Sequence, residues 1–379
     1  MKIRSITIGT NLDKIKQENK LKKLSDFSKK ITEEFEQKGF PVQTVRLTLQ
    51  HDEKHFKNQE KFLDEIKKIQ SQIEDYGWDY FNIGTINKTK NIVFLDEIYK
   101  NTTNCFTSIP LIKNKKINYE KAKKTAFLIK KLSKLEKNGF ANLRLAVHFN
   151  VKPGGAFYPA SYHKGKKDIF AIATENSDLL HQSFSKNNQN IKDYFKKMKK
   201  IFSKEYKKIE KISKKTKEKD IKYGGIDCSI CPSVKPENSI AYAFEKIGLG
   251  KFGKPGTLYI AKNVTETIKK IPVNKCGYNG LMLPVLEDYG LAERNKQGYF
   301  DLKDLLSYSS VCGTGLDTIP LPGNVSHDKI YSLLLDIAAL SLKLEKPLSA
   351  RLMPIPNKKT GDLTEFDFEY FKNTSVMKI

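Results

Sequence analysis

Apolar positions in the first half of the chain alternate between short continuous runs and stretches with helical spacing. Runs rich in β-branched and aromatic residues predict strands at Ile3–Thr10, Val42–Leu49, Tyr80–Gly84, Ile92–Leu95, Leu143–Phe149 and Asp168–Ala173. Charged stretches with apolar residues every three or four positions predict helices at Lys20–Lys38, Gln59–Tyr76 and Tyr119–Lys137. Strands separated by helices indicate a mainly parallel α/β sheet or barrel.

The second half continues the same alternation. Strands are predicted at Lys222–Ile230 and Ser349–Ile355, and helices at Glu175–Phe184, Asn238–Ile247, Gly256–Ile268 and Ser326–Leu344. Two short runs, Leu281–Val285 and Leu316–Leu321, have the composition of buried segments. Because no repeat and no linker interrupts the pattern, we expect residues 1–379 to form one barrel-like α/β domain.

One segment departs from the rest in composition. Between Lys186 and Lys222 there are fifteen lysines and five acidic residues, while the apolar residues keep helical spacing. We interpret residues 186–222, approximately, as a helical insertion at the surface with one buried stripe. Binding of a polyanion to this segment is the less favoured interpretation.

The chain as a whole is strongly basic, with a formal net charge of +25. Of its 68 basic residues only five are arginine, whereas proteins that read phosphates and base edges rely on the arginine fork. We therefore do not expect nucleic-acid binding. The first residues lack the apolar core of a signal peptide, and no apolar run is long enough to span a bilayer, so a cytoplasmic protein without a membrane segment is expected.

Candidate chemistry lies in loops that combine Gly, Pro, Cys and acidic residues at the edges of apolar runs. They contain Asp227, Asp288 and the segment from Cys312 to Asp317. A further Pro- and Gly-rich loop follows the strand Leu143–Phe149 and ends at His163. Such compositions suit backbone held in special geometry beside reactive groups, so a concave site is predicted.

Four residues are candidates for catalysis: Cys312, His163, Asp227 and Asp317. A thiol beside the amides of a Gly-rich turn would act as nucleophile or hydrogen carrier, and an imidazole as acid or base. The carboxylates would orient substrate or bind a divalent metal. Each also has a structural alternative: Cys312 as a core residue, Asp227 as a turn cap, and Asp317 as a partner of loop amides.

Five residues are candidates for binding the substrate. Arg351 lies in an apolar strand-like run and is a candidate anion clamp, with an internal ion pair as its alternative. The others come from the candidate loops: Tyr158, Gly155, Gly313 and Asp288. The pair Cys228-x-x-Cys231 is a single such motif followed by a proline-rich loop, so neither zinc nor redox chemistry is required of it. The cofactor is left open, with a divalent metal as one option.

These loops resemble the domain of unknown function 711 family, also labelled PFL family proteins, over nearly the whole chain. The resemblance rests on the segments Arg4–Gly9, Phe157–His163, Val311–Asp317 and Arg351–Asp362. It implies a fold similar to pyruvate formate-lyase and anaerobic ribonucleotide reductase, which is a ten-stranded α/β barrel made of two five-stranded halves. It does not imply a particular reaction. The Cys228-x-x-Cys231 motif and the lysine-rich insertion depart from the common family pattern.

The best-known chemistry of that fold needs a glycine that stores a radical close to the C-terminus. The last glycine here is Gly361, in a segment typical of a turn, so no glycyl radical is expected. Fold alone does not carry function. Two hypotheses remain: an enzyme acting on a small anionic metabolite inside the barrel, or a non-catalytic sensor of a metabolite such as an amino acid. The resemblance also implies a small ACT-type regulatory partner, and we expect a homo-oligomer.

Overall fold

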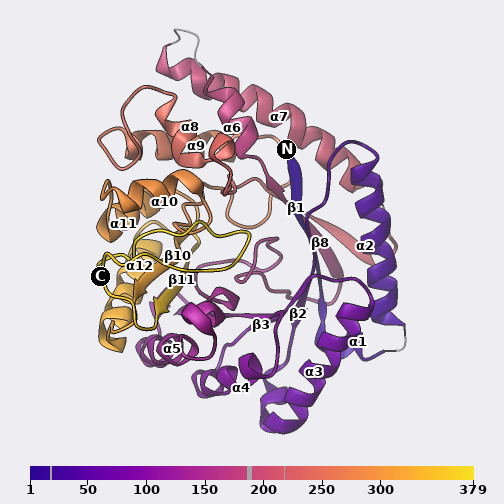
Figure 1. The fold of residues 1–379 in the computed structure, drawn as a ribbon. Coiled ribbons are helices and arrows are strands. Elements are labelled where there is room, and N and C mark those ends of the chain that lie inside the picture. The colour runs from indigo at the N-terminus through magenta and orange to yellow at the C-terminus, as the bar shows by residue number, and fades with distance from the viewer. Residues whose placement is uncertain (18, 186–189, 217) are drawn as a thin grey trace.

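The centre of the protein is a curved mixed sheet of nine strands with helices around its outside (Figure 1). The computed structural model describes residues 1–17, 19–185, 190–216 and 218–379. The strands are β1 (Lys2–Asn11), β2 (Val45–Gln50), β3 (Tyr80–Thr85), β4 (Cys105–Pro110), β7 (Leu145–Phe149), β8 (Asp168–Glu175), β9 (Ile221–Asp227), β10 (Gly315–Pro322) and β11 (Leu348–Ile355). A separate hairpin pairs β5 (Ile112–Lys113) with β6 (Lys116–Ile117).

The helices alternate with these strands along the chain. The α-helices are α1 (Leu12–Ile15), α2 (Lys20–Glu36), α3 (Gln59–Asp75), α4 (Leu95–Lys100), α5 (Tyr119–Leu132), α6 (Ser177–Ser183), α7 (Ile191–Lys215), α8 (Ile240–Glu245), α9 (Thr257–Lys269), α10 (Tyr289–Lys296), α11 (Leu302–Val311) and α12 (His327–Lys343). Short 3₁₀ turns are η1 (Glu53–Lys57), η2 (Thr89–Phe94), η3 (Lys137–Arg144) and η4 (Pro236–Asn238). None of the helices in the described part of the chain has the length and apolar character needed to cross a bilayer.

The sheet consists of a central parallel block of five strands with a parallel pair on each side that runs in the opposite direction. Its order is β10-β11-β7-β4-β3-β2-β1-β8-β9. Strands β1, β2, β3, β4 and β7 are parallel to one another. At the two junctions β8 is antiparallel to β1 and β11 is antiparallel to β7, while β9 is parallel to β8 and β10 to β11. Parallel neighbours need long crossovers, and helices such as α2 and α3 supply them.

The two edge strands approach each other through an irregular segment. Residue Ile226 of β9 forms an isolated bridge with Lys275, and Ile230 forms one with Leu281. On the other side, the Gly313 amide donates to the carbonyl of Leu281 at 3.1 Å. The run Leu281–Val285 is buried as predicted but forms no regular strand. The α/β prediction is therefore confirmed, whereas a closed ten-stranded barrel is not shown in the described residues.

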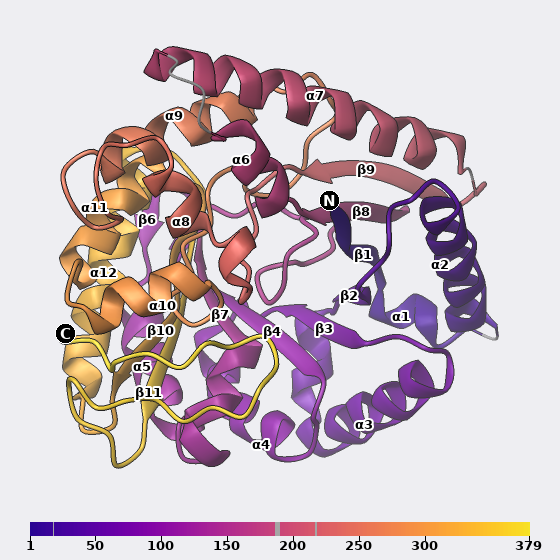
Figure 2. The same cartoon turned by 45° about the horizontal axis from the view of Figure 1, so that its top comes forward.

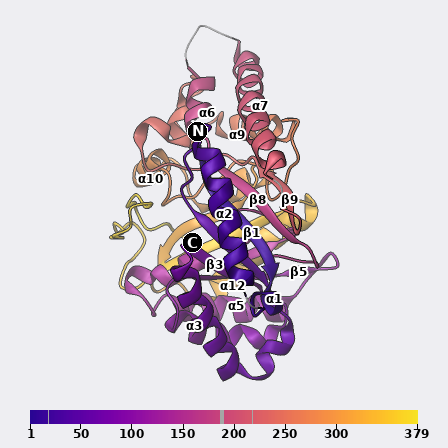
Figure 3. The same cartoon turned by 90° about the vertical axis from the view of Figure 1, so that its right-hand side faces the viewer.

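Side chains alternate between the two faces of the sheet along each strand, and on β8 the two faces carry side chains of different size. On β8, Phe170 and Ile172 belong to the main core on the helix side, where Phe27 of α2 meets Phe170 at 5.2 Å between ring centroids. Figure 3 shows α2 running alongside these strands. On the inner face, Ala171 and Ala173 belong to a second, smaller cluster. Small inward side chains leave room inside the curve of the sheet.

That room is occupied by the segment 152–163, here called the inner loop (Figure 2). Inward polar side chains bind its backbone: the Thr7 hydroxyl donates to the Ala156 carbonyl at 2.8 Å, and the Asn82 amide donates to the Pro159 carbonyl at 2.6 Å. Buried backbone groups need such partners. The polar residues of β1 and β3 therefore hold the inner loop in place.

Several boundaries differ from prediction. Residues Ile92–Leu95 are not a strand but the end of η2 and the start of α4, because a short apolar run does not distinguish a strand from a buried helical turn. Strand β4 was not predicted. The helix expected near 186–222 is confirmed as α7, while residues 186–189 and 217 lie outside the described residues.

Candidate functional site

A cavity of about 110 Å³ lies between the inner loop and the inner faces of the central strand block and of the pair β10 and β11. Its walls come from β1, β2, β3, β4, β7, β10 and β11, together with loops around residues 231, 278–287 and 368–370. Apolar side chains such as Phe106, Phe157 and Met282 form part of the lining. Pockets that bind small molecules are mostly apolar with a few placed polar groups, and this cavity has that character.

Three of the five arginines in the chain line this one cavity: Arg4 on β1, Arg46 on β2 and Arg351 on β11. Each is largely buried, and each belongs to a strand whose register places it inward. Since arginine is scarce in this protein and lysine abundant, the gathering of three guanidinium groups is the dominant chemical feature of the cavity.

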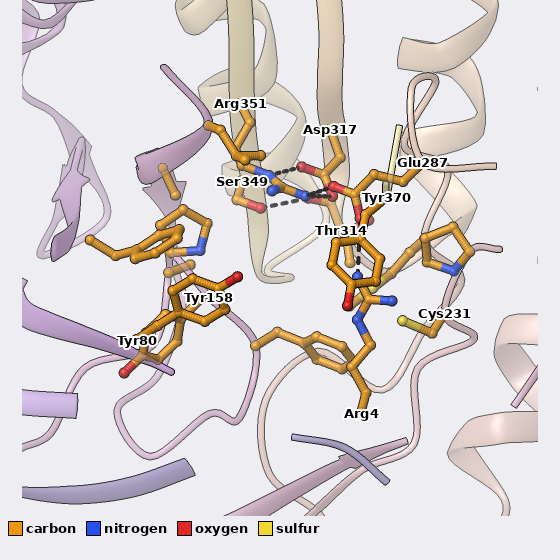
Figure 4. Close-up of a pocket in the computed structure, with 18 of the residues that line it drawn as sticks. Arg4, Tyr80, Tyr158, Cys231, Glu287, Thr314, Asp317, Ser349, Arg351 and Tyr370 are labelled. Atoms are coloured by element: carbon orange, nitrogen blue, oxygen red, sulfur yellow. Dashed lines mark hydrogen bonds and ion pairs between the residues drawn. The ribbon is translucent and has the colours of Figure 1, made fainter. Parts of the chain in front are cut away.

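Arg351 is held by two carboxylates (Figure 4). One amino group of its guanidinium donates to Asp317 at 2.8 Å and to Glu287 at 2.6 Å, and its Nε donates to Asp317 as well. Burial by itself would lower the pKa of Arg351, but the two carboxylates outweigh burial and raise that pKa. Glu287 also meets Arg4 at 3.3 Å. The four groups therefore form a connected network on one wall.

Arg46 stands apart from that network. Its Nε donates to the Thr44 hydroxyl at 3.0 Å, and its guanidinium carbon lies 5.2 Å from the ring centre of Tyr158 and 5.8 Å from that of Tyr80. Within the described part of the chain, no carboxylate lies at ion-pair distance from it. Burial, reinforced by the charge of Arg4, lowers the pKa of Arg46 to about 10. This guanidinium is a buried cation without a counter-charge.

One thiol, that of Cys231, also lines the cavity and lies beside Arg4 in Figure 4. Its side chain is buried. Burial raises the pKa of the Cys231 thiol to about 12, although the nearby Arg4 acts in the opposite direction. At neutral pH the sulfur of Cys231 is therefore a thiol rather than a thiolate. Thr314 and Ser349 also contribute polar side chains to the lining.

Of the candidate residues, the structure brings Asp317, Arg351 and Tyr158 together around this cavity. Asp317 and Arg351 form the ion pair described above, so Arg351 has the internal ion pair that is the alternative to an anion clamp. Tyr158 contributes its ring, because its hydroxyl donates to the backbone carbonyl of Leu47. Their roles toward a bound molecule stay predictions.

Two other carboxylates are engaged with backbone instead. Asp227 accepts hydrogen bonds from the Ser229 hydroxyl at 2.6 Å and from the amides of Tyr278 and Asn279 at 2.7 and 3.0 Å. Burial raises the pKa of Asp227, while these donors oppose the rise. Asp288 caps α10 and accepts from the Leu291 amide at 3.1 Å. Both carboxylates hold loops in place and lie outside the cavity lining.

Cys312, Gly313 and Gly155 are also outside the residues that line the cavity. Cys312 ends α11, is buried, and its amide donates to the Tyr308 carbonyl at 2.7 Å. Gly313 packs directly on the backbone of Gly280, so that a Cβ there would lie 2.4 Å from the Gly280 Cα. These contacts give Gly313 a packing role.

His163 lines a different cavity at the other end of the inner loop. The structure therefore separates His163 from Cys312, which lines neither cavity, and the expected pairing of thiol and imidazole in one site is not found. In the part of the chain that is described, no group of three or more His, Cys, Asp or Glu residues could hold a metal ion.

Sequence reasoning did not single out Arg4, Arg46 or Glu287 as site residues, and it left the role of Cys231 open. A signal for two of them was present, since Arg4 and Arg46 each lie within a predicted apolar strand, the same pattern that singled out Arg351. Arg144 shared the pattern but points elsewhere: its guanidinium binds backbone carbonyls of Tyr99 and Thr102. No local signal distinguishes these two outcomes.

The fold and the cavity define an α/β protein with an arginine-lined internal site. The chain belongs to the family described as Uncharacterised ACR (DUF711), whose model matches residues 1–369.

The chain is also similar to UPF0210 proteins of several organisms. It is 35% identical to the one of Pyrobaculum aerophilum over 168 residues, which cover 43% of this chain and 37% of the relative. The protein of Clostridium perfringens is 26% identical over 258 residues, covering 66% of this chain and 57% of the relative. That of Acetivibrio thermocellus is 25% identical over 293 residues, with 74% and 65% covered. The matched part of the chain thus spans about half the length of these relatives.

Proposed function

We propose that the protein binds a small organic carboxylate in the arginine-lined cavity, with Arg46 as the anchor. The single observation that carries the proposal is the buried guanidinium of Arg46 at the cavity wall, which has no carboxylate partner among the described residues. Burying a charge without a partner is unfavourable, so such groups are generally paired or serve a ligand. A carboxylate is the planar partner that a guanidinium fork binds with two hydrogen bonds.

The charges around the cavity support an anionic ligand. Three guanidinium groups, of Arg4, Arg46 and Arg351, face two carboxylates, of Glu287 and Asp317. One added negative charge would balance the site. The aromatic rings of Tyr158 and Phe157 supply an apolar wall for the carbon skeleton of the ligand. The volume of about 110 Å³ suits a small metabolite rather than a nucleotide or a peptide.

Binding without chemical change is the better-supported form of this proposal. Both carboxylates in the lining are engaged by Arg351, and the Cys231 thiol is protonated at neutral pH because burial raises its pKa to about 12. A nucleophilic cysteine needs a lowered pKa. Turnover is the second candidate, favoured by the presence of a thiol in the cavity lining. Mass spectrometry of the ligand before and after incubation with the protein separates binding from turnover.

The test compares wild-type protein with Arg46→Met by calorimetric titration of small carboxylates (acetate, succinate, alanine and glutamate). Loss of a charged hydrogen-bonding pair of about 1.5 to 3 kcal/mol should weaken binding by roughly tenfold or more. Because Arg46 has no counter-charge, its replacement should change the free energy of unfolding by less than about 1 kcal/mol.

The matched control is Arg294→Met, which removes an arginine outside the cavity that pairs with Glu245 at 2.7 Å. It should leave carboxylate affinity unchanged. If wild-type protein binds none of these compounds at millimolar concentration, or if Arg46→Met binds them as tightly as wild type, the proposal is wrong.

A further inference from the structure

A second cavity, of about 310 Å³, lies at the carboxyl ends of the parallel strands. Its lining includes Gln50 at the end of β2, Thr85 at the end of β3, Pro110 at the end of β4 and Asn150 just after β7. In open α/β sheets, ligands bind outside the carboxyl ends of the strands. The inner loop separates this cavity from the first one, since Tyr158 lines the first and His163 the second.

Three imidazoles line this second cavity: His51, His148 and His163. His163 is 2% exposed, and neither of its ring nitrogens has a hydrogen-bond partner among the described residues. His148 is 3% exposed; its Nε2 lies 3.0 Å from the Thr85 hydroxyl, while its Nδ1 has no partner in the described chain. Buried polar atoms without partners are rare in folded proteins because they cost stability. Both residues line the cavity, so a ligand there lies next to the imidazoles whose nitrogens lack a partner in the described chain.

The charges near the second cavity select the kind of ligand. Lys164 is the one charged side chain among its lining residues, and no carboxylate lines it. Behind the wall, the Lys121 ammonium donates to the carbonyl of Asn87. The nearby Glu53 carboxylate is already engaged by the amides of Asn87 and Lys88 at 3.0 and 3.2 Å. A cationic ligand would therefore find no carboxylate among the lining residues, whereas an anion would find the Lys164 ammonium.

A metal ion is a poor fit for the same site. The three imidazoles do not come close enough together to form a group that could hold a metal, as far as the described residues go. Burial lowers the pKa of His163, and burial together with the Lys121 charge lowers the pKa of His148 to about 3. Neutral imidazole offers one N–H donor and one acceptor nitrogen. Hydrogenphosphate carries both acceptor oxygens and an O–H donor, so it satisfies both kinds of nitrogen, whereas a carboxylate only accepts.

We propose that the second cavity binds phosphate, either free or as the phosphoryl group of a small metabolite, through His163, His148 and Lys164. This inference is independent of the carboxylate site, because it rests on other residues in another cavity. The side-chain amide of Gln50 lies in the same lining, and its NH2 group is of a type that donates to phosphate oxygens.

The experiment measures binding of inorganic phosphate and of glycerol phosphate by calorimetric titration and by thermal unfolding. All variants are made in the Arg46→Met background, so that a phosphate entering the first cavity does not contribute. Comparison of the two compounds distinguishes free phosphate from a phosphorylated metabolite. The expected result is saturable, one-to-one binding of at least one of them. No binding of either at 10 mM, roughly ten-thousandfold above a dissociation constant of about 1 μM, would overturn the proposal.

The substitution His163→Leu should affect stability and phosphate affinity in different ways. It removes two unpartnered nitrogens, so the ligand-free variant should unfold at the same temperature as its parent or at a higher one, while phosphate affinity falls by about tenfold or more. The matched control is His181→Leu, another buried histidine, whose Nε2 is bonded to the Ser239 carbonyl at 2.6 Å. That control should unfold at a lower temperature and keep phosphate affinity. If His163→Leu is destabilised like the control, or binds phosphate like its parent, the inference is wrong.

A second pair of variants changes only exposed residues. Lys164→Met removes the lysine at the cavity, and Lys167→Met removes a lysine of the same loop that does not line it. Both keep the fold, because both lysines are exposed. Affinity should fall several-fold in Lys164→Met alone. Equal effects of the two substitutions would mean that general surface charge, and not this cavity, attracts phosphate.

Discussion

Replacement of Arg351 by Met should destabilise the protein strongly, because it leaves two buried carboxylates without their main partner. The side chains of Arg351, Asp317 and Glu287 are 12%, 12% and 9% exposed, so solvent screens them little. Breaking a buried ion pair from one side costs about 3 to 5 kcal/mol. Since Arg4 still meets Glu287 at 3.3 Å, we expect the lower end of that range, about 3 kcal/mol.

The measurement is urea unfolding at pH 7, followed by circular dichroism, with the slope of free energy against urea compared between variants. A second substitution, Asp317→Asn in the Arg351→Met background, removes one of the stranded charges. The double variant should therefore be more stable than Arg351→Met alone. This recovery separates an electrostatic effect from simple loss of packing.

Arg294→Met is the matched control for stability, because Arg294 binds Glu245 through two parallel hydrogen bonds of 2.7 and 2.8 Å. Only one carboxylate is stranded there, and it keeps the Phe252 amide at 3.1 Å and Lys251 at 3.3 Å. The control should therefore lose less stability than Arg351→Met. A loss below about 1 kcal/mol in Arg351→Met, or a larger loss in the control, would refute the reasoning.

Two further predictions concern buried histidine and close backbone packing. The folded-state pKa of His148, lowered to about 3 by burial and by Lys121, lies below the value of about 6.5 in the unfolded chain, so the unfolded state binds more protons at intermediate pH. The free energy of unfolding should therefore fall as pH drops from 6.5 toward 4, by about 1.4 kcal/mol per pH unit from this group, and titrations of His148→Gln should lack that contribution to the slope. Gly313→Ala should cost about 2 kcal/mol or more in urea unfolding, because its Cβ would lie 2.4 Å from the Gly280 Cα. Gly155→Ala, whose Cβ would meet only a Cα at 3.5 Å, is the control and should be tolerated.

Much of the secondary structure could be predicted from the sequence because it depends on local periodicity. Helix α2 was expected at Lys20–Lys38 and spans Lys20–Glu36, and β1 was expected at Ile3–Thr10 and spans Lys2–Asn11. These segments have strong apolar patterns that bury one face whatever surrounds them. Where the pattern was short, as at Ile92–Leu95, helix and strand could not be told apart.

The candidate site was predicted only in part. The apolar strand around Arg351 marked it as a buried cation, and the acidic loop marked Asp317, but nothing local showed that the two would pair with each other. Asp227 has a similar loop composition and binds backbone amides instead. Loop composition therefore identifies residues held in special geometry without distinguishing a carboxylate in a cavity from one that fastens a turn.

Periodicity along the chain determines which positions are buried, because burial of a helix or strand face depends on neighbours three, four or two residues away. Strand order and curvature determine which buried side chains face each other. Arg4, Arg46 and Arg351 meet across the inside of the sheet although hundreds of residues separate the first and the last, and the inner loop puts Tyr158 and His163 into different cavities. Such meetings depend on contacts between distant segments, which a local pattern does not encode, and so only the folded structure decides them.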